Sequence, residues 1–112
     1  METIAALRSL SALSHESRLA AFRILVQAGH DGLPVGELRE RLDIPAATLT
    51  AHLNILRAAA LVHDQREGRV IRVRANYRQM NGLVDYLTEN CCGGATACGP
   101  TQSCTSTEKA SA

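Results

Sequence analysis

Four cysteines are the residues of this chain whose type and placement most directly indicate chemistry. All four lie beyond residue 90 of the 112-residue sequence, at Cys91, Cys92, Cys98 and Cys104. Thiols confined to one end of a chain cannot cross-link a hydrophobic core, so we do not expect a disulfide framework. Thiolates are nucleophiles and ligands for soft metals, and these cysteines are therefore predicted to do chemistry rather than to hold the fold together.

The spacing of the first three cysteines indicates a particular ligand. Cys91 and Cys92 are adjacent, and Gly93-Gly94 lets the chain turn back so that Cys98 can reach them. Trivalent arsenic binds three thiolates in a pyramid, with its lone pair at the fourth corner. Structural zinc more often uses Cys-x2-Cys pairs in a closed tetrahedron, and this sequence has no such pair. The pattern favours trivalent arsenic, or antimony, bound by Cys91, Cys92 and Cys98.

Other interpretations of the cysteines stay open at this point. A zinc or cadmium site can recruit Cys104 as a fourth sulfur, a disulfide can act as a redox switch, and the thiols can be idle. A thiol enzyme such as an arsenate reductase, with Cys91 or Cys92 as nucleophile, is a rival of another class. No phosphate-binding loop or helix start adjoins these cysteines. We therefore predict a binding protein and not an enzyme.

Length and composition indicate one domain that folds without help from its thiols. A chain of 112 residues can bury a sufficient core by itself. Two tyrosines and one phenylalanine are its only aromatic residues, so the core must consist of aliphatic side chains, which favours helices over a β-sandwich. We expect residues 1–90 to form the domain. Residues 91–112, rich in Gly, Ser and Thr, are expected to form a flexible cysteine-containing tail.

The amino end and the hydropathy pattern predict a cytoplasmic protein. The first residues, METIAALRSL, include Glu2 and lack the basic start and apolar run of a secretion signal. No stretch approaches the roughly 18 apolar residues of a membrane helix. We therefore expect no membrane partner and a compartment in which thiols stay reduced.

Apolar residues recur at helical spacing through most of the chain. Ser14 is the predicted N-cap of the second helix, and Asn76 is the predicted N-cap of the last. The third and fourth helices are joined by the short turn Asp43-Ile44, which predicts a helix-turn-helix motif. The helices are expected at about residues 4–13, 15–28, 35–42, 46–59 and 77–90.

The periodicity changes from helical to alternating after the fourth helix. In Ile71-Arg72-Val73-Arg74 apolar and basic residues alternate, and Glu67-Gly68 supplies a turn. We therefore predict a β-hairpin over residues 61–74 with one basic face. Arg66 and Arg69 flank its turn, where they can reach phosphates or a minor groove. The predicted fold is mainly α with a β-hairpin, a winged helix-turn-helix.

Positive charge is concentrated in the middle of the chain. Residues 39–78 contain eight Arg and four acidic residues, although the net charge of the chain is only +1. If Leu49, Leu53 and Leu56 face the core, the fourth helix presents small and polar side chains to a DNA groove. Each of them taken singly is more often an ordinary surface residue, and it is their combination with a basic hairpin that favours DNA binding. The predicted contacts of this helix are Ala47, Thr48, Thr50, Ala51, His52 and Asn54.

These motifs resemble the ArsR/SmtB family of metal-responsive winged-helix repressors. The matching stretches cover about residues 4–90 and are LSHESRLAAFRILVQAG, LPVGELRERLDIPAATLTAHLNILRAAALV and REGRVIRVRA. The resemblance implies a homodimer that pairs through its first and last helices and binds a double-stranded DNA operator. It makes Thr48, Thr50, Ala51 and His52 the recognition-helix contacts. Ala60 departs from the family pattern, because glycine usually precedes Leu-Val at this point.

The cysteines resemble those of an arsenic-responsive subgroup, which carries an adjacent cysteine pair and a third cysteine just after the last helix. The family's best-known arsenic site lies on the helix before the recognition helix, where residues 33–42 contain no cysteine. Its better-known zinc site pairs Asp with His on the last helix, and Asp85 has no His near it there. The resemblance therefore implies a repressor that releases its operator when arsenite, or antimonite, binds the three cysteines. The alternative is a zinc-, cadmium- or thiol-redox-responsive repressor of the same fold.

Overall fold

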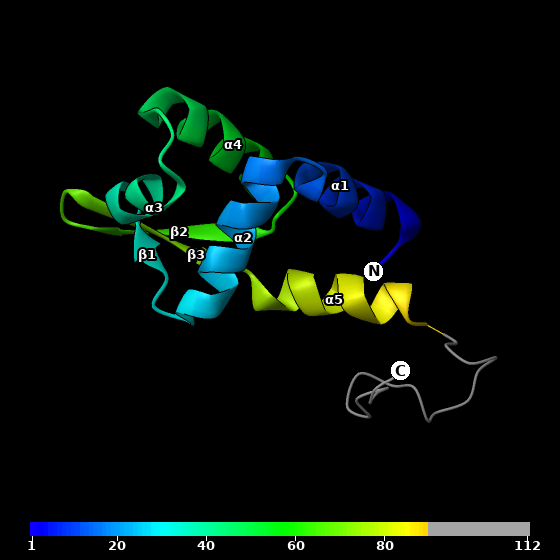
Figure 1. The fold of residues 1–112 in the computed structure, drawn as a ribbon. Helices are drawn as coiled ribbons and strands as arrows, with labels where there is room; N and C mark the ends of the chain where they lie inside the picture. The colour runs from blue at the N-terminus through cyan, green and yellow to red at the C-terminus, as the bar shows by residue number, and fades with distance from the viewer. Residues whose placement is uncertain (90–112) are drawn as a thin grey trace, which may run out of the picture.

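The computed structural model describes residues 1–89, which contain five helices and a three-stranded antiparallel sheet (Figure 1). The helix-turn-helix is formed by α3 and α4, and the wing is formed by β2 and β3, so the predicted winged helix-turn-helix is confirmed. No helix in this part of the chain is long and apolar enough to cross a membrane. The elements in chain order are α1 Thr3–Leu13, α2 Glu16–Ala28, β1 Leu33–Pro34, α3 Val35–Leu42, α4 Ala46–Ala58, β2 Val62–Glu67, β3 Val70–Ala75 and α5 Tyr77–Leu87.

Two helix starts show how local sequence sets these boundaries. Asn76 caps α5 as predicted, because its side-chain oxygen accepts a hydrogen bond of 3.3 Å from the backbone N–H of Gln79. The prediction of Ser14 as the cap of α2 was wrong. His15 caps this helix, and its Nδ1 accepts a hydrogen bond of 3.1 Å from the backbone N–H of Ser17. A neutral imidazole has an unprotonated ring nitrogen and can therefore replace the usual hydroxyl or carboxylate.

The core lies between α2, α4 and the inner face of the sheet. Leu49, Leu53 and Leu56 are buried along one side of α4, as the sequence predicted. Burying one leucine side chain contributes roughly 2 kcal/mol, so the three together hold the rotation of this helix. The largest fully buried hydrophobic side chains are Leu25, Leu38, Leu49, Leu53, Leu56, Leu61 and Val73.

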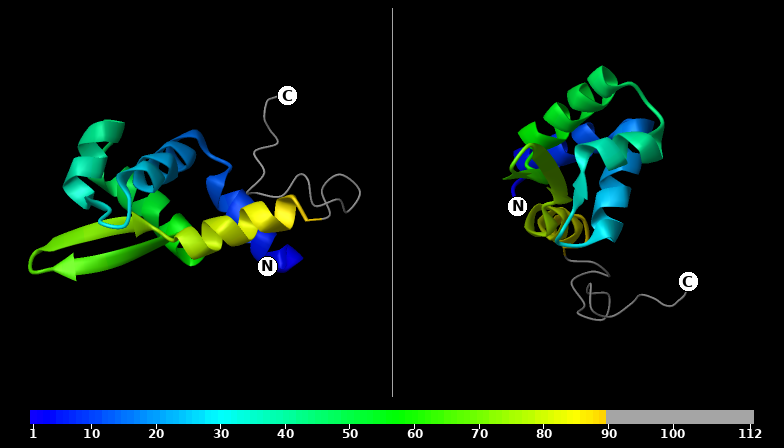
Figure 2. Two further views of the ribbon diagram at one scale, coloured as in Figure 1. Left: turned by 90° about the horizontal axis from the view of Figure 1, so that it is seen from below. Right: turned by 90° about the vertical axis from the view of Figure 1, so that its left-hand side faces the viewer.

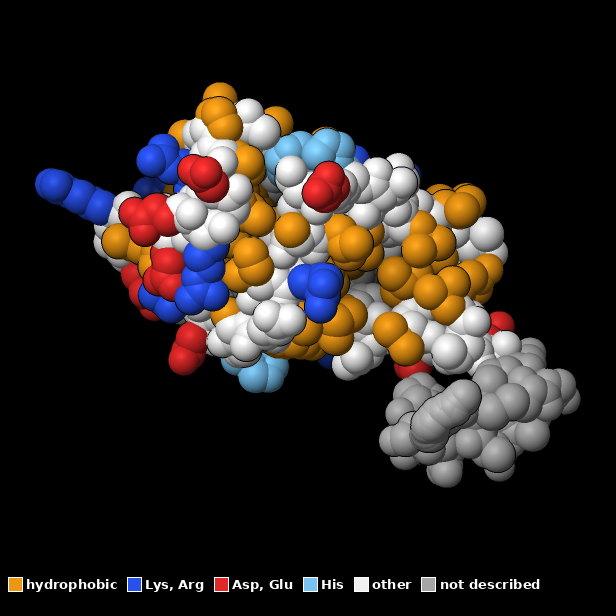
Figure 3. Space-filling view, viewed as in Figure 1, with side chains coloured by type: hydrophobic (Ala, Val, Ile, Leu, Met, Phe, Trp, Pro, Cys, Tyr) orange, Lys and Arg blue, Asp and Glu red, His pale blue; other side chains and the backbone are white. Residues whose placement is uncertain are grey.

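The helices α1 and α5 lie side by side at the end of the molecule opposite the wing (Figures 1 and 2). The hydroxyls of Thr3 and Tyr86, 2.6 Å apart, join them. The buried side of α1 consists of the small residues Ala6, Ser9 and Ala12. Its larger apolar residues point outward, together with two residues of α5, and orange side chains gather over this end in Figure 3. We call this surface the outer apolar face, formed by Ile4, Leu7, Leu10, Val84 and Leu87.

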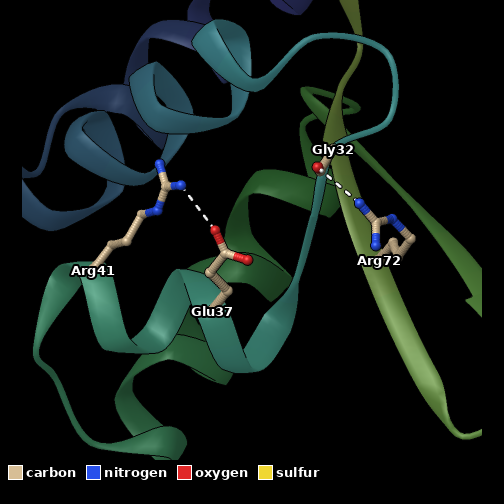
Figure 4. A network of polar contacts seen from close by, with 4 residues as sticks. All are labelled: Gly32, Glu37, Arg41 and Arg72. Atoms are coloured by element: carbon tan, nitrogen blue, oxygen red, sulfur yellow. Dashed lines mark hydrogen bonds and ion pairs between the residues drawn. The ribbon is translucent and has the colours of Figure 1, made fainter.

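The strand β1 was not predicted. Leu33 pairs with Val73 and Pro34 with Arg72, which gives the strand order β1-β3-β2. Two residues that include a proline form no alternating pattern, so the sequence carried no signal for this strand. The guanidinium of Arg72 donates hydrogen bonds to the carbonyl of Asp31 at 3.0 Å and to that of Gly32 at 3.2 Å; Figure 4 shows the second. Arg72 therefore secures the loop before β1 to the sheet.

Gly32 lies where this loop comes closest to the sheet. Its φ is +65°, in the left-handed region that favours glycine. A Cβ at this position would overlap the backbone carbonyl of Val73. Space and backbone conformation both require glycine here.

Figure 4 also shows the exposed ion pair between Glu37 and Arg41 of α3, at 2.8 Å.

The recognition helix α4 ends in a hydrogen-bonded turn that normally contains glycine. The backbone N–H of Leu61 donates to the carbonyl of Leu56 at 3.0 Å, and that of Ala60 donates to the carbonyl of Arg57 at 2.9 Å. This pair of bonds defines a Schellman motif, whose left-handed residue is usually glycine. Here the left-handed residue is Ala60, with φ +61°. Glycine is the usual residue at this position in the family that the sequence resembles. In this chain alanine takes its place, although the backbone there has a positive φ.

We predict that Ala60→Gly raises the free energy of unfolding by about 1 kcal/mol, because a Cβ is disfavoured in the left-handed region. Urea denaturation followed by circular dichroism measures the change. Ala58→Gly is the matched control, since Ala58 is exposed on the same helix in right-handed backbone and its replacement should cost about 1 kcal/mol. Loss of stability in both variants would contradict the strain at Ala60.

Candidate nucleic-acid interface

The three buried leucines of α4 decide which of its side chains face outward. Of the predicted contacts, His52 is half-buried and the other five are exposed. Alanines at positions 47, 51 and 58 form the middle of the outward side, and such small side chains let a helix approach a groove closely. The structure therefore presents Ala47, Thr48, Thr50, Ala51 and Asn54 together, whereas their contact with DNA stays a prediction.

Thr50 and Asn54 lie on the side of α4 that faces the wing, and both have intramolecular partners. The hydroxyl of Thr50 donates a hydrogen bond of 3.0 Å to the carbonyl of Ala46 in the preceding turn. Its proton is used within the helix, so in this rotamer Thr50 offers an incoming group only acceptor capacity. The side-chain oxygen of Asn54 accepts a hydrogen bond of 2.8 Å from Arg57 Nη1.

The two arginines of the wing that are predicted to contact DNA lie in different places. Arg66 is on the face of the wing that is turned toward α4, and Arg69 is at the tip. Arg66 is opposite Ile71 in the β2–β3 pairing, so it shares a face with the buried Val73. Arg69 follows Gly68 at the turn and borders an open hollow of about 560 Å³ between the wing and α4. Thr50 also lines this hollow. The predicted basic tip and the recognition helix therefore form one concave surface.

The basic face predicted for the hairpin has a different role from its tip. Arg72 and Arg74 lie on the opposite side of the sheet from Val73, because side chains alternate along a strand. Arg72 is occupied by the loop carbonyls of Asp31 and Gly32. Part of the positive charge in the middle of the chain therefore stabilises the fold and is not available to DNA.

A polar network that the sequence analysis missed joins α4 to the wing. Arg57 donates to Asn54, and its Nε lies 2.8 Å from Oδ2 of Asp64 on β2, without the alignment of a hydrogen bond. The side chains of Arg57 and Asp64 are 30% and 39% exposed, so the ion pair contributes at most about 1 kcal/mol. The spacing of Asn54 and Arg57 on one helix was a possible sequence signal, because residues three apart are neighbours. The approach of Asp64 depends on tertiary packing.

His52 lies at the margin of the recognition surface, where α4 meets the start of α2. Its ring is stacked at a tilt on His15, with the ring centroids 4.6 Å apart, and pale blue side chains gather at this junction in Figure 3. Burial lowers the pKa of His52, and the neighbouring His15 and Arg18 lower it further. His52 Nδ1 is buried and has no hydrogen-bond partner among residues 1–89. The neutral imidazole is therefore favoured in the free protein.

The predicted metalloid ligands Cys91, Cys92 and Cys98 lie outside the described residues, as does Cys104. Within residues 1–89, no three His, Cys, Asp or Glu side chains lie close enough together to hold a metal ion. Helix α5 ends at Leu87, shortly before the first cysteine in the sequence.

A helix-turn-helix with an exposed recognition helix beside a basic hairpin defines a winged-helix DNA-binding protein. Residues 13–65 match a family model described as a helix-turn-helix domain. Over 78 residues, or 70% of this chain, it is 35% identical to the biofilm growth-associated repressor of Agrobacterium fabrum. Over an equal length it is 30% identical to the transcriptional activator HlyU of Vibrio cholerae. The match spans 64% of the first relative, which is less than two thirds, and 69% of the second.

A solved structure extends the likeness beyond the helix-turn-helix. An ArsR-like transcriptional regulator from Rhodococcus sp. RHA1 has a TM-score of 0.66 and 30% identity, covering 75% of this chain and 76% of that one. The chain belongs to the ArsR family of winged-helix transcription regulators. These relatives are regulators and not enzymes, in agreement with the prediction that this protein is not an enzyme.

The lowered pKa of His52 predicts that stability falls as the medium becomes acidic. The unfolded chain, with the ordinary pKa of 6.5, takes up the proton before the folded chain does. The contribution of neutral His52 is therefore complete above pH 6.5 and is lost as the pH falls through the folded-state pKa. Urea denaturation between about pH 7.5 and pH 5.5 measures this slope.

His52→Gln should flatten the slope of stability against pH, because glutamine does not titrate. His63→Gln, at an exposed position of β2, is the matched control and should leave the contribution of His52 in place. A slope that is unchanged in His52→Gln would contradict the assignment of acid sensitivity to this residue.

Proposed function

We propose that this protein is a repressor that binds a DNA operator as a homodimer and releases it when trivalent arsenic, or antimony, binds Cys91, Cys92 and Cys98. Helix α4 lies in the major groove in this proposal, and Arg66 and Arg69 contact the flanking backbone or minor groove. Such a protein acts in the cytoplasm, where DNA is accessible and thiols stay reduced. One relative is a repressor and another is an activator, so the proposed direction of control rests on the resemblance of the cysteines to an arsenic-responsive subgroup of repressors.

The observation that carries the proposal is the direct connection between the recognition helix and the helix that precedes the cysteines. Asn76, the cap of α5, donates from its side-chain amide to the carbonyl of Ala60 at 2.8 Å. Its backbone N–H donates to the carbonyl of Leu61, also at 2.8 Å. Both acceptors belong to the turn that ends α4. A displacement of α5 therefore acts on the end of the recognition helix through two hydrogen bonds.

The outer apolar face supports the homodimer. Ile4 and Leu7 of α1 are 63% and 59% exposed, and Leu87 of α5 is 57% exposed. Large exposed apolar side chains on two helices that contact each other mark a protein interface more often than a solvated face. Pairing two copies through it about a two-fold axis presents two recognition helices to the half-sites of a pseudo-palindrome. This pairing would also place α5, the helix that precedes the cysteines in the sequence, beside the subunit interface.

The chemistry of the cysteines supports the ligand class. Three thiolates suit a soft, three-coordinate metalloid, and the adjacent pair is more typical of an open pyramid than of a zinc tetrahedron. Release requires that the ligand bind the free protein more tightly than the operator-bound protein, since equal affinity for both states shifts nothing. We propose that metalloid capture after the end of α5 changes the spacing of the two recognition helices and so weakens operator binding.

Leu7→Glu should convert the protein from dimer to monomer. A buried carboxylate on the outer apolar face is costly, and each dimer would contain two, so dimerisation should weaken by at least about a hundredfold. Sedimentation velocity measures the oligomeric state. Gln65→Glu, at an exposed position of β2 in the wing, is the control and should remain dimeric. A wild-type monomer, or a Leu7→Glu variant that remains dimeric, would contradict pairing through α1.

Arsenite should release the protein from the double-stranded DNA that lies upstream of its reading frame. Fluorescence anisotropy of the labelled DNA measures release, which we expect at low micromolar arsenite and not with equal zinc. Cys91→Ser, Cys92→Ser and Cys98→Ser should each retain DNA binding and lose the response. Cys104→Ser is the matched control, because a pyramidal site has no need of a fourth sulfur.

The outcomes of this titration separate the alternatives. Release by zinc or cadmium that depends on Cys104 would favour a tetrahedral metal site, and release by an oxidant alone would favour a redox switch. DNA binding that ignores arsenite would overturn the metalloid site and leave the DNA-binding function intact. Absence of binding to any DNA would overturn the proposed function as a whole.

A further inference from the structure

The oxygen of the Asn54 amide already accepts a hydrogen bond within the protein. The atom that faces Arg57 Nη1, at 2.8 Å, is the side-chain oxygen, since arginine has donors and no acceptor. The amide nitrogen therefore keeps both of its donors for an incoming ligand, whereas the oxygen keeps one of its two lone pairs. Asn54 is exposed on the recognition helix, on the side toward the wing. An asparagine held in this way acts outward mainly as a hydrogen-bond donor, because its oxygen already accepts a bond from a cation.

Arg57 is itself held in place by the wing. Its Nε lies 2.8 Å from the carboxylate of Asp64, and its side chain is 30% exposed. Asp64 is paired across the hairpin with Val73, which is fully buried, so the backbone that carries the carboxylate is anchored to the core. The guanidinium therefore has two contacts on different elements, one on β2 and one on α4. These contacts form a chain from the wing to Asn54.

We propose that Asp64 and Arg57 are positioning residues that make Asn54 a hydrogen-bond donor in base recognition, so that it selects guanine or thymine over adenine. This inference rests on the proposed placement of α4 in the major groove. A free asparagine pairs with adenine by accepting from N6 and donating to N7. Arg57 takes one of the two lone pairs of the Asn54 oxygen and places a positive charge beside it, so adenine N6 finds a weakened acceptor there. Guanine O6 and N7 and thymine O4 all accept the bond that it offers.

The charge of Arg57 strengthens this preference. A hydrogen bond from a guanidinium polarises the amide, which makes the opposite N–H a better donor. The same charge repels the exocyclic amino groups of adenine and cytosine, which carry partial positive charge. The carboxylate of Asp64 offsets part of this positive charge. It also holds the guanidinium of Arg57 in place, so that Arg57 stays bonded to Asn54 and does not turn toward a phosphate.

Selection of binding sites from a randomised duplex library, with sequencing of the bound fraction, tests the inference. The position that loses its preference in Asn54→Ala is the one that Asn54 contacts. The wild-type protein should prefer guanine or thymine over adenine there by about tenfold. Arg57→Met, which frees the oxygen of Asn54, should bring this ratio to within about threefold. Asp64→Asn, which keeps the shape and removes the charge, should reduce it as well.

A second readout separates positioning from a structural effect. Asp64→Asn removes a negative charge near the phosphates, so its affinity for unrelated DNA should rise while its base preference falls. Damage to the fold would lower both affinities and the melting temperature. Glu67→Gln is the matched control, because it removes an acidic group from the same strand, outside the network. It should raise the affinity for unrelated DNA and leave the base preference unchanged.

Each result supports or overturns the inference. A selected motif with adenine at the Asn54 position, or a preference unchanged in Arg57→Met, would overturn the positioning role and leave operator binding intact. A motif that Asn54→Ala does not alter would overturn the base contact itself. If the wild-type protein selects no motif at all, the proposed operator binding fails, which is distinct from a failure of the inference.

Discussion

Burial of Leu49, Leu53 and Leu56 sets the rotation of α4 about its axis, and the whole recognition surface depends on that rotation. Each leucine contributes roughly 2 kcal/mol on burial, whereas the partly exposed pair of Arg57 and Asp64 contributes at most about 1 kcal/mol. The apolar side therefore decides which polar side chains meet the solvent. The ion pair then orients groups that the leucines have already placed.

The wing is tied to the rest of the domain on both of its faces. On the face away from the core, Arg72 donates to backbone carbonyls of the loop before β1, and Gly32 permits the close approach. On the inner face, Asp64 meets Arg57 of α4. A hairpin by itself is marginally stable, so these contacts give the tip a defined position beside the recognition helix. Basic residues of one short strand pair thus divide between stabilising the fold and facing the side of the wing that lies beside α4.

At the end of the molecule opposite the wing, α5 lies beside α1 and is also connected to the end of α4. Small residues on the inner side of α1 let it pack closely, which leaves its larger apolar side chains outward beside those of α5. Asn76 then connects the start of α5 to the turn that ends α4, where Ala60 has a left-handed conformation. The outer apolar face, helix α5 and the end of α4 are therefore joined by a few short contacts.

Much of the fold followed from local signals in the sequence. Helical and alternating periodicities predicted the helices and the hairpin, and Asn76 was a correct cap, because these features depend on residues close together in the chain. The same periodicity correctly predicted the buried side of α4 and the surface position of most candidate contacts. Histidine is a rare helix cap, which is why Ser14 was preferred to His15.

The sequence by itself determined the five helices, the hairpin, the outward side of α4 and the cysteine spacing, since each is set by neighbouring residues. Only the tertiary structure decided that β1 joins the sheet, that Arg72 secures a loop and that the oxygen of Asn54 faces inward. It also placed His15 against His52. These features depend on contacts between residues distant in sequence, whose geometry exists only once the leucine core has brought the elements together.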